Sequence, residues 1–247
     1  MSDFIYMSIV VDIGNTRIKV AKFKNKELVK VTFLKQDEVL NVLSKLNFKS
    51  GIISNVGNKS LCQKILKSFP ELFIMNYKLK FPVKINYSSI NSLGNDRIAN
   101  VVGAYSMFPN NNNLVIDVGT CITYDFINDS NVYLGGSISP GFNLRMMSLS
   151  SFTESLPIVN LKLKKTSLIG KSTKESMKSG VVNGTIGEIV QNIYAYKQLY
   201  SELNVLLTGG DTTFLKSIVS IKKNSIFADE NLTIKGLNNI IKFNVEK

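Results

Sequence analysis

Two short glycine turns carry the residue types that phosphate chemistry uses. The first turn, Asp12 to Arg17, joins a carboxylate, a glycine, an amide, a hydroxyl and a guanidinium at the end of an apolar run. Glycine lets backbone amides approach phosphate oxygens, and a carboxylate beside them can hold Mg²⁺ directly or through water. A hairpin that uses Gly14 and Asn15 for their permissive backbone explains the same residues equally well. Alone, this segment leaves both alternatives open.

The second turn repeats the pattern of the first. When Asp117 is aligned with Asp12, the residues VIDVGT match VVDIGN, and an alternating apolar stretch follows each turn. A unit that recurs at domain-sized separation indicates two related α/β halves with a ligand between them. The repeat therefore favours phosphate binding over two unrelated hairpins. The chain contains no GxxxxGK[ST] string, so these turns are not P-loops.

A third segment, Gly94-Asn95-Asp96-Arg97, stands just before an apolar helical pattern over residues 98–105. We therefore expect Asp96 at or beside a helix N-terminus, where aspartate commonly caps. The functional alternative is a general base that accepts the proton of an attacking alcohol, with Arg97 gripping an anionic substrate group. We favour this alternative, although one aspartate can do both, because arginine is scarce and suits forked contacts. Three arginines occur, each in or beside a glycine-bearing segment: Arg17, Arg97 and Arg145.

Composition excludes several kinds of catalysis. The chain has 247 residues, of which 44% are hydrophobic, so it can bury a substantial core. It has no histidine, which rules out Ser-His and Cys-His catalysis and leaves acid–base work to carboxylates, lysine or tyrosine. Its two cysteines, Cys62 and Cys121, lie far apart. A structural zinc site or a disulfide framework is therefore not expected.

Charge and hydropathy bear on partners and location. The net charge is +12, but the basic residues are spread along the chain, which fits attraction to anionic metabolites better than a nucleic-acid partner. No 18-residue apolar run and no signal-like N-terminus is present. We expect a cytoplasmic protein without a membrane or nucleic-acid partner.

The first half of the chain predicts strands followed by helices. Apolar runs and alternation predict the strands, and 3.6-residue spacing predicts the helices. The expected strands are 9–14, 18–23, 27–34 and 51–55, with another near Phe73, and the expected helices are 38–46 and 59–69. A run of asparagines at 110–113 marks a solvated loop and a domain boundary.

The second half predicts a similar mixture. The expected strands are 114–118, 121–126, 132–138 and 203–207, and the expected helices are 143–150, one after Lys171, and 213–220 before a short tail. The helix after Lys171 opens with a capping box at Ser172 and Glu175. Its apolar stripe favours core packing, with a subunit interface as the alternative. The stripe consists of Ile186, Ile189, Val190, Ile193 and Tyr200.

These elements predict two domains. Residues 1–112 form the first, with the first phosphate turn and the 94–97 segment. Residues 113–247 form the second, with the second phosphate turn and the long helix that is the candidate for a dimer contact.

Together, five motifs resemble the type III pantothenate kinases in order and spacing, over nearly the whole chain. They are DIGNTRIK (Asp12–Lys19), Tyr87 followed by GNDR (Gly94–Arg97), DVGTCITYD (Asp117–Asp125), GGSISPG (Gly135–Gly141) and GKST (Gly170–Thr173). The resemblance implies an α/β, actin-like ATPase fold with two related halves, each a mixed, ribonuclease H-like sheet flanked by helices. It also implies phosphorylation of pantothenate by ATP, the first step of coenzyme A biosynthesis, in a homodimer that uses Mg²⁺ and a monovalent cation, K⁺ or NH₄⁺.

The resemblance assigns a role to each matching position. Asp96 is the catalytic proton acceptor, and Thr173 reaches the substrate, across the dimer. Asp117 holds the monovalent cation, and Asp12 holds Mg²⁺ through phosphate or water. The ATP-binding residues are Asp12, Ile13, Gly14, Asn15, Thr16, Arg17, Ile18, Lys19 and Thr120, and the pantothenate-binding residues are Tyr87, Gly94, Asn95, Asp96, Arg97 and Thr173.

Some residues and functions stay open. Cys121 and Ile122 stand where the family often has small or polar residues, Asp125 is either polar support or a solvated strand end, and Arg145 has no assigned role. One rival function is a catalytically silent transcriptional accessory protein, which need not retain Asp96 and Arg97. Another is a sugar kinase or polyphosphate hydrolase of the same architecture. The segment from Tyr87 to Arg97 instead favours an alcohol substrate that carries a carboxylate.

Overall fold

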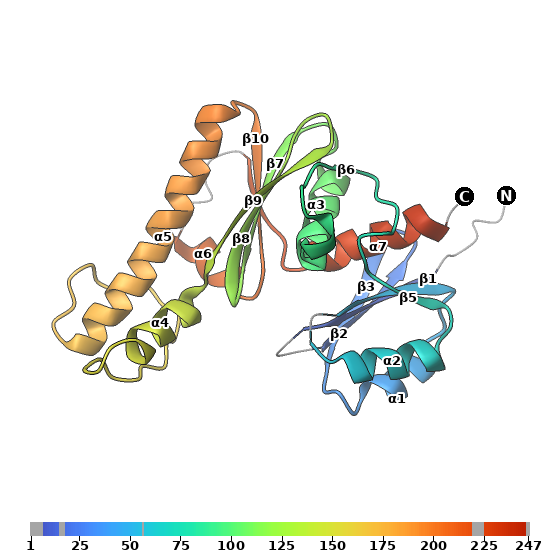
Figure 1. Cartoon of the computed structure of the whole chain (residues 1–247), viewed down its shortest axis with the longest axis horizontal. Helices are drawn as coiled ribbons and strands as arrows, with labels where there is room; N and C mark the ends of the chain where they lie inside the picture. The colour runs from blue at the N-terminus through green and yellow to red at the C-terminus, as the bar shows by residue number, and fades with distance from the viewer. Residues whose placement is uncertain (1–6, 15–17, 56, 219–224, 246–247) are drawn as a thin grey trace. The chain divides into compact units, whose positions relative to one another are not determined.

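A computed structural model describes residues 7–14, 18–55, 57–218 and 225–245 (Figure 1). Its contacts divide the chain into two units, the first formed by Met1–Met107 with Leu232–Lys247 and the second by Phe108–Asn231. The predicted domains 1–112 and 113–247 stay a prediction. The contacts add that the C-terminal helix α7 (Leu232–Val245) belongs with the first unit.

The sheet of the first unit has the strand order β3-β2-β1-β4-β5. Strands β1, β2 and β3 are antiparallel neighbours, whereas β4 runs parallel to β1 and β5 parallel to β4. The strands are β1 (Met7–Ile13), β2 (Ile18–Lys24), β3 (Glu27–Leu34), β4 (Ser50–Asn55) and β5 (Leu72–Ile74). The other elements are α1 (Val39–Ser44), α2 (Lys59–Ser68), β6 (Lys84–Ile85), the 3₁₀ helix η1 (Ile90–Ser92), α3 (Asn95–Met107) and α7.

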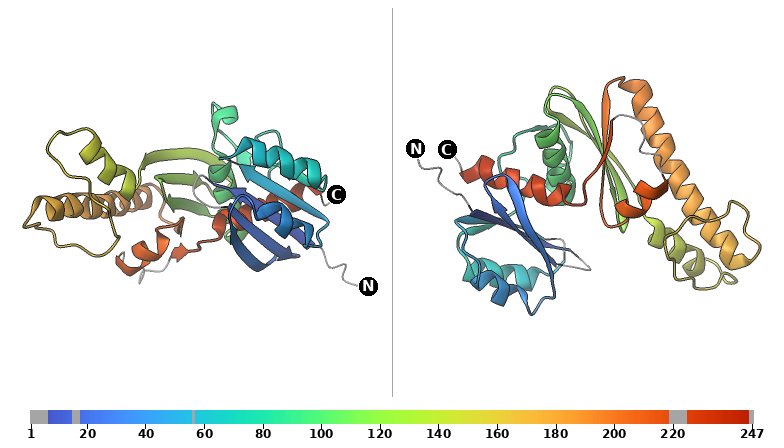
Figure 2. Two further views of the ribbon diagram at one scale, coloured as in Figure 1. Left: turned by 90° about the horizontal axis from the view of Figure 1, so that it is seen from below. Right: turned by 180° about the vertical axis from the view of Figure 1, so that it is seen from behind.

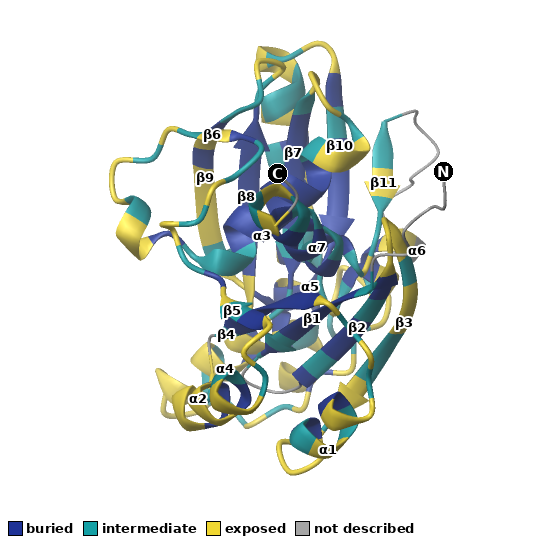
Figure 3. Cartoon of the chain, turned by 90° about the vertical axis from the view of Figure 1, so that its right-hand side faces the viewer, coloured by how far each residue is buried: buried dark blue, intermediate teal, exposed yellow. Residues whose placement is uncertain are grey.

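Strand β1 is buried on both faces, which explains its continuous apolar sequence (Figure 3). Because side chains alternate along a strand, Ile9, Val11 and Ile13 share one face, where they join the core formed with α1 and α2. On the opposite face the Ser8 hydroxyl donates to Oδ1 of Asn238 on α7, 2.6 Å away. The first phosphate turn thus follows a strand that is fixed from both sides.

The second unit repeats this architecture. Its strands follow the order β11-β10-β7-β8-β9. Strands β7, β8 and β9 are antiparallel neighbours, whereas β10 runs parallel to β7 and β11 parallel to β10. Each strand therefore matches one of the first unit in order and direction, which confirms the two related halves. The strands are β7 (Asn112–Val118), β8 (Cys121–Ile127), β9 (Val132–Pro140), β10 (Leu203–Thr208) and β11 (Ile226–Ala228).

Helices α4 (Phe142–Ser151), α5 (Thr173–Leu199) and α6 (Thr212–Ile218) complete the second unit (Figure 2). Ile189 and Ile193 of α5 are buried in its core, as predicted, whereas Val190 is 48% exposed. At the start of α5 the Ser172 hydroxyl accepts from the Glu175 amide, as a capping box requires. The Glu175 carboxylate, however, accepts from the amide of Lys171 instead of that of Ser172.

The prediction of a short tail after α6 is wrong, because residues 232–245 form helix α7. The buried residues of α7 include Leu237, Ile240 and Ile241, whose spacing of three and four is typical of a helix. Helix α7 crosses α3 at very short range. A side chain at Gly236 would overlap the carbonyl oxygen of Ala99, and one at Gly103 would lie 2.7 Å from the carbonyl oxygen of Leu232.

Candidate functional site

The first phosphate turn places a carboxylate at the end of β1. Asp12 is the last residue but one of that strand, opposite Lys19 of β2 and beside Ser54 of β4. Burial raises the pKa of Asp12 above its usual value, although the Lys19 charge and a hydrogen bond with Ser54 pull the pKa down. This carboxylate is therefore one whose negative charge an added cation would stabilise.

Some of the other residues predicted to bind ATP at this turn are described by the structure, and some are not. Ile13 and Ile18 are buried partners across the β1–β2 hairpin, so their apolar side chains serve the core and only their backbone is available to a ligand. Gly14 lies in the turn between the strands. The remaining three, Asn15, Thr16 and Arg17, lie outside the described residues.

Asp96 lies in the first turn of α3, as predicted. Its Oδ1 accepts from the backbone amide of Arg97 at 2.9 Å, and its charge contributes to the raised pKa of Asp12. A side chain at Gly94 would overlap Oδ1 of Asp96, so glycine at that position leaves room for the carboxylate. Asp12 and Asp96 thus belong to the same unit, and the Asp96 charge is the smallest of the four influences on the pKa of Asp12.

The start of α3 carries Asn95 and Arg97, and the ring of Tyr87 contacts Arg97. The guanidinium carbon of Arg97 lies 5.8 Å from the centre of the Tyr87 ring, and Arg97 is buried. An aromatic face under a guanidinium fixes its plane and is favourable by about 0.5–2 kcal/mol. The side-chain amide of Asn95 donates to the carbonyl oxygen of Met75 at 3.1 Å, which ties this turn to the chain after β5.

The second phosphate turn joins β7 to β8 in the second unit. Asp117 is again the last residue but one of its strand, and Thr120 is exposed in the turn. The backbone amide of Gly119 donates to the carbonyl oxygen of Cys121 at 3.0 Å, and the amide of Gly141 donates to that of Thr120 at 2.9 Å. The turn therefore contacts Gly141, the N-cap residue of α4.

The structure adds candidate residues that the sequence analysis does not assign, at the end of β10. Thr208 pairs with Asp117 in the sheet, and a side chain at Gly209 (φ 95°) would overlap Oδ1 of Asp117. The buried Thr208 hydroxyl has no hydrogen-bond partner among the described residues. Burial raises the pKa of nearby Asp211, whose amide donates to the carbonyl oxygen of Val118 at 3.0 Å. The sequence signal that could have identified these residues is the string Thr-Gly-Gly-Asp at the end of an apolar strand, which combines glycine with a carboxylate as the two phosphate turns do.

Thr173, the remaining residue predicted to bind the substrate, is the first residue of α5 and is exposed.

No group of three or more cysteine or acidic side chains that could hold a metal ion occurs in the described ranges. A metal ion at the first turn would therefore be held by few protein oxygens together with a ligand, as is common for Mg²⁺ with phosphates.

Comparison with known proteins decides the family. The sequence profile of the type III pantothenate kinases matches residues 8–195. This chain belongs to that family. The type III pantothenate kinase of Christiangramia forsetii is 41% identical over 244 residues, which cover 96% of this chain and 99% of that protein. Because the match spans both units, the whole chain is that of a type III pantothenate kinase.

Solved structures show the fold of this pantothenate kinase. A conserved protein from Campylobacter jejuni, assigned to the Baf family of transcriptional activators, has a TM-score of 0.61 and 24% identity, over 96% of this chain and 98% of that one. The activator of the 2-hydroxyisocaproyl-CoA dehydratase from Clostridium difficile, with bound ADPNP, has a TM-score of 0.55 and 12% identity, over 96% and 94%. These similarities concern the fold alone, which is the predicted actin-like ATPase fold. In the part of the chain that the structure describes, no helix is long and apolar enough to cross a membrane.

Proposed function

We propose that this chain transfers the terminal phosphoryl group of ATP to the primary hydroxyl of pantothenate, giving 4'-phosphopantothenate, the first step of coenzyme A biosynthesis. Membership of the family supports the reaction. The observation that carries the assignment to residues is the placement of two carboxylates in one unit: Asp12 at the end of β1 and Asp96 in the first turn of α3. One carboxylate of such a pair can serve a cation on the phosphates while the other serves the attacking hydroxyl.

In this proposal Asp96 is the general base. Its carboxylate lies in the first turn of α3, next to Arg97 of the substrate segment. Arg97 and Tyr87 bind the pantothenate carboxylate, because a guanidinium whose plane is fixed by an aromatic ring offers a forked contact. Gly94 and Asn95 complete this substrate segment, Gly94 by leaving room for the base and Asn95 by anchoring the turn.

ATP binds at the two glycine turns. The residues that would contact its phosphates are Asp12 to Lys19 in the first unit, of which 15–17 lie outside the described residues, and Thr120 in the second. Mg²⁺, when bound, would neutralise charge on the phosphates, and the Asp12 carboxylate offers the hard oxygen ligand that it prefers. Lys19, opposite Asp12, adds a fixed positive charge beside the turn. Asp117 would hold the monovalent cation, with K⁺ or NH₄⁺ as the candidates.

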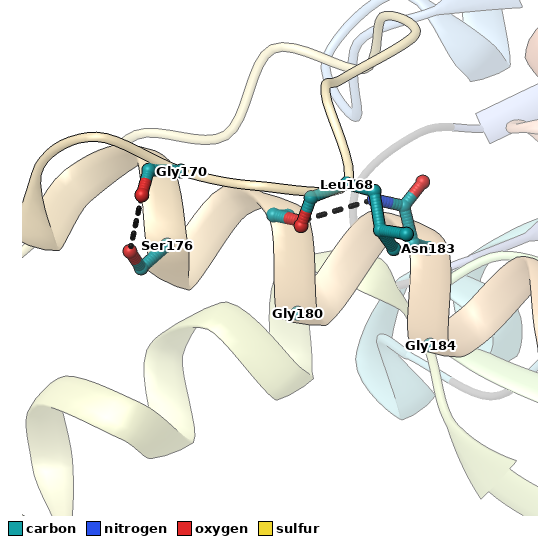
Figure 4. A pocket seen from close by; sticks show the side chains of 7 residues that line it. Leu168, Gly170, Ser176, Gly180, Asn183 and Gly184 are labelled. Carbon is teal, nitrogen blue, oxygen red and sulfur yellow. Dashed lines mark hydrogen bonds between the residues drawn. The ribbon is translucent and has the colours of Figure 1, made fainter.

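We further infer a homodimer through α5. A side chain at Gly180 or Gly184 would meet no atom within 4 Å, so this stretch of α5 has room for a close neighbour. Both glycines line a hollow of about 530 Å³ together with Leu168 and Gly170. Figure 4 shows these residues on α5 and on the segment beside it. Leu168 and its neighbour Ile169 are 80% and 75% exposed, so two adjacent large apolar side chains are available for a partner chain to cover. Sedimentation equilibrium measures the subunit number, and a monomer at micromolar concentration would contradict this inference.

The dimer bears on Thr173, which opens the same helix. A partner chain seated on α5 would bring its own Thr173 close to the contact, and the proposed substrate role of this residue depends on that arrangement. Neither a nucleic acid nor a membrane belongs to the proposal, and a cytoplasmic location stays a prediction.

The reaction is tested by measuring ATP consumption by the purified protein with pantothenate and Mg²⁺, in K⁺ or in Na⁺ as the sole monovalent cation. We expect turnover that depends on pantothenate and is faster in K⁺. Equal rates in the two salts would contradict the proposal that Asp117 holds a specific monovalent cation, but would not contradict the proposed reaction. A folded protein that is inactive in both salts would contradict the reaction and favour the accessory-protein alternative.

Replacing Arg97 by lysine should raise the KM for pantothenate roughly 10- to 100-fold, because an ammonium loses the forked contact and about 1.5–3 kcal/mol with it. The KM for ATP should stay within about twofold. Lys78→Ala is a matched control, since the Lys78 amino group also lies over a tyrosine ring, 6.0 Å from the centre of Tyr77, outside the substrate segment. An unchanged pantothenate KM in Arg97→Lys would contradict the role of Arg97.

A further inference from the structure

A polar cluster in the second unit joins helix α5 to the second phosphate turn. Its centre is Glu188 of α5, whose Oε1 accepts from the Tyr124 hydroxyl on β8 at 3.0 Å and from the Ser139 hydroxyl on β9 at 2.6 Å. The other carboxylate oxygen, Oε2, forms an ion pair with the guanidinium of Arg145 on α4. One carboxylate therefore takes donors from three different elements.

Arg145 extends this cluster to the start of α4. Its Nε donates to the carbonyl oxygen of Pro140 at 2.7 Å, and one of its terminal nitrogens also lies 3.3 Å from the Ser139 hydroxyl. Its backbone amide donates to the carbonyl oxygen of Gly141 at 3.0 Å. Arg145 thus binds two successive carbonyl oxygens, that of Pro140 through its side chain and that of Gly141 through its backbone. A lysine could not make both side-chain contacts, because its single nitrogen lacks the guanidinium fork.

Gly141 is in direct contact with the phosphate turn. Its amide donates to the carbonyl oxygen of Thr120, and any side chain at this position would overlap the carbonyl oxygen of Gly119. A displacement of Gly141 therefore moves Gly119 and Thr120. Hydrogen bonds therefore lead from Glu188 through Arg145 and Gly141 to the turn, a path that no single motif in the sequence contains.

We propose that Glu188 and Arg145 are positioning residues that hold the Gly119–Thr120 turn in place to bind the phosphates of ATP. The inference rests on the proposed function of that turn, and it gives Arg145 a role. It also assigns a task to α5 beyond packing, because the carboxylate that fixes the turn comes from this helix.

The electrostatics of the cluster are consistent with a rigid support. Burial would raise the pKa of Glu188, but the hydrogen bonds from Ser139, Arg145 and Tyr124 outweigh it and hold the pKa below its usual value. The Tyr124 side chain is almost fully buried, and burial together with the Glu188 charge raises its pKa, so it remains a proton donor. Glu188 and Arg145 are each only about a quarter exposed, at 26% and 25%. Such charge-assisted contacts are stronger and more directional than those on an open surface.

The test compares Glu188→Gln and Arg145→Lys with the wild-type chain. Glutamine keeps the size of the side chain but loses the charge that Arg145 pairs with, and lysine keeps the charge but loses the fork. We expect the KM for ATP and the Kd for a non-hydrolysable ATP analogue to rise about tenfold in each variant, since a small displacement of a phosphate turn is costly. The KM for pantothenate should change less than about twofold, because Arg97 and Tyr87 belong to the other unit.

Two further variants separate positioning from general stability. Glu202→Gln removes an exposed carboxylate just after α5 and should leave both KM values unchanged. The double variant Arg145→Lys with Glu188→Gln should raise the ATP KM about as much as either single change, because residues that act through one contact are not additive. A fall in Tm without a change in nucleotide Kd would show a purely structural cluster and overturn the inference, as would equal changes in both KM values.

The nucleotide Kd also separates this inference from the proposed reaction. If the wild-type chain binds the ATP analogue but does not phosphorylate pantothenate, the reaction fails while the comparison of Kd values still tests the positioning role. If the wild-type chain phosphorylates pantothenate and the variants bind the analogue as tightly as it does, the positioning role fails alone.

Discussion

Replacing Asp96 by asparagine should lower kcat by roughly 10²- to 10⁴-fold, the range that a general base contributes. The KM for ATP should stay within about threefold, because the nucleotide is proposed to bind at the glycine turns. Asparagine has nearly the same shape as aspartate and keeps an oxygen that can accept from the Arg97 amide. The substitution therefore removes the basic carboxylate without removing the contact at the start of α3.

Thermal unfolding shows whether Asp96→Asn loses activity through the missing base or through a loss of stability. Asparagine is as good as aspartate at a helix N-terminus in its hydrogen bonding, and only the interaction of the charge with the helix dipole, about 0.3–1 kcal/mol, is lost. Relief of the repulsion between Asp96 and Asp12 acts in the opposite direction. The Tm should thus stay close to that of the wild-type chain. Near-normal turnover would refute Asp96 as the base, and a fall in activity that merely followed a fall in Tm would leave it a capping residue.

The residues that the sequence identified best are those whose roles are local. A strand, a glycine turn and a second strand are contiguous, so the repeat at Asp12 and Asp117 could be seen without knowing any long-range contact. The structure confirms both hairpins and the same strand order around them. Asp96 could be placed at a helix start for the same reason, since the apolar spacing that follows it is local.

The residues that the sequence analysis left without a role depend on contacts between distant segments. Thr208 reaches Asp117 only because β10 lies parallel to β7, and strand order is not written in either strand. Arg145 and Glu188 stand 43 residues apart, and each alone is typical of a solvated charge on a helix. Val190 belongs to the apolar stripe for which core packing was the favoured prediction and a subunit interface the alternative. It is exposed in the single chain, because the burial of a helical face depends on which neighbour covers it.

Helix α7 was missed for a related reason, although a local signal existed. Its apolar residues lie at helical spacing, but it follows residues whose pattern is weak and it packs on α3, more than 120 residues earlier in the chain. Gly236 also disfavours a helix by about 1 kcal/mol relative to alanine. The structure explains this glycine by the crossing: its missing side chain lets the backbone of α7 approach that of Ala99.

Gly236→Ala should therefore destabilise the chain, against the trend of helix propensity. The added methyl group overlaps backbone at Ala99, which cannot rotate away as a side chain can, so α3 and α7 must separate. Overpacking costs about 1–3 kcal/mol, and separation of the helices would add the loss of buried contacts, so a net loss of about 2 kcal/mol remains after the gain in propensity. Urea unfolding followed by circular dichroism measures this difference.

Lys64→Ala on α2 is the control, because it places alanine at an exposed position of a helix outside the proposed dimer contact. It should leave the free energy of unfolding within about 0.5 kcal/mol of the wild-type value. Equal effects in the two variants would show that the α3–α7 crossing is looser than described. Because α3 carries Asp96 on its first turn, separation of the helices should also displace the base. We therefore expect the folded fraction of Gly236→Ala to retain ATP binding better than turnover, which would connect the fit of α7 on α3 to the chemistry at the start of that helix.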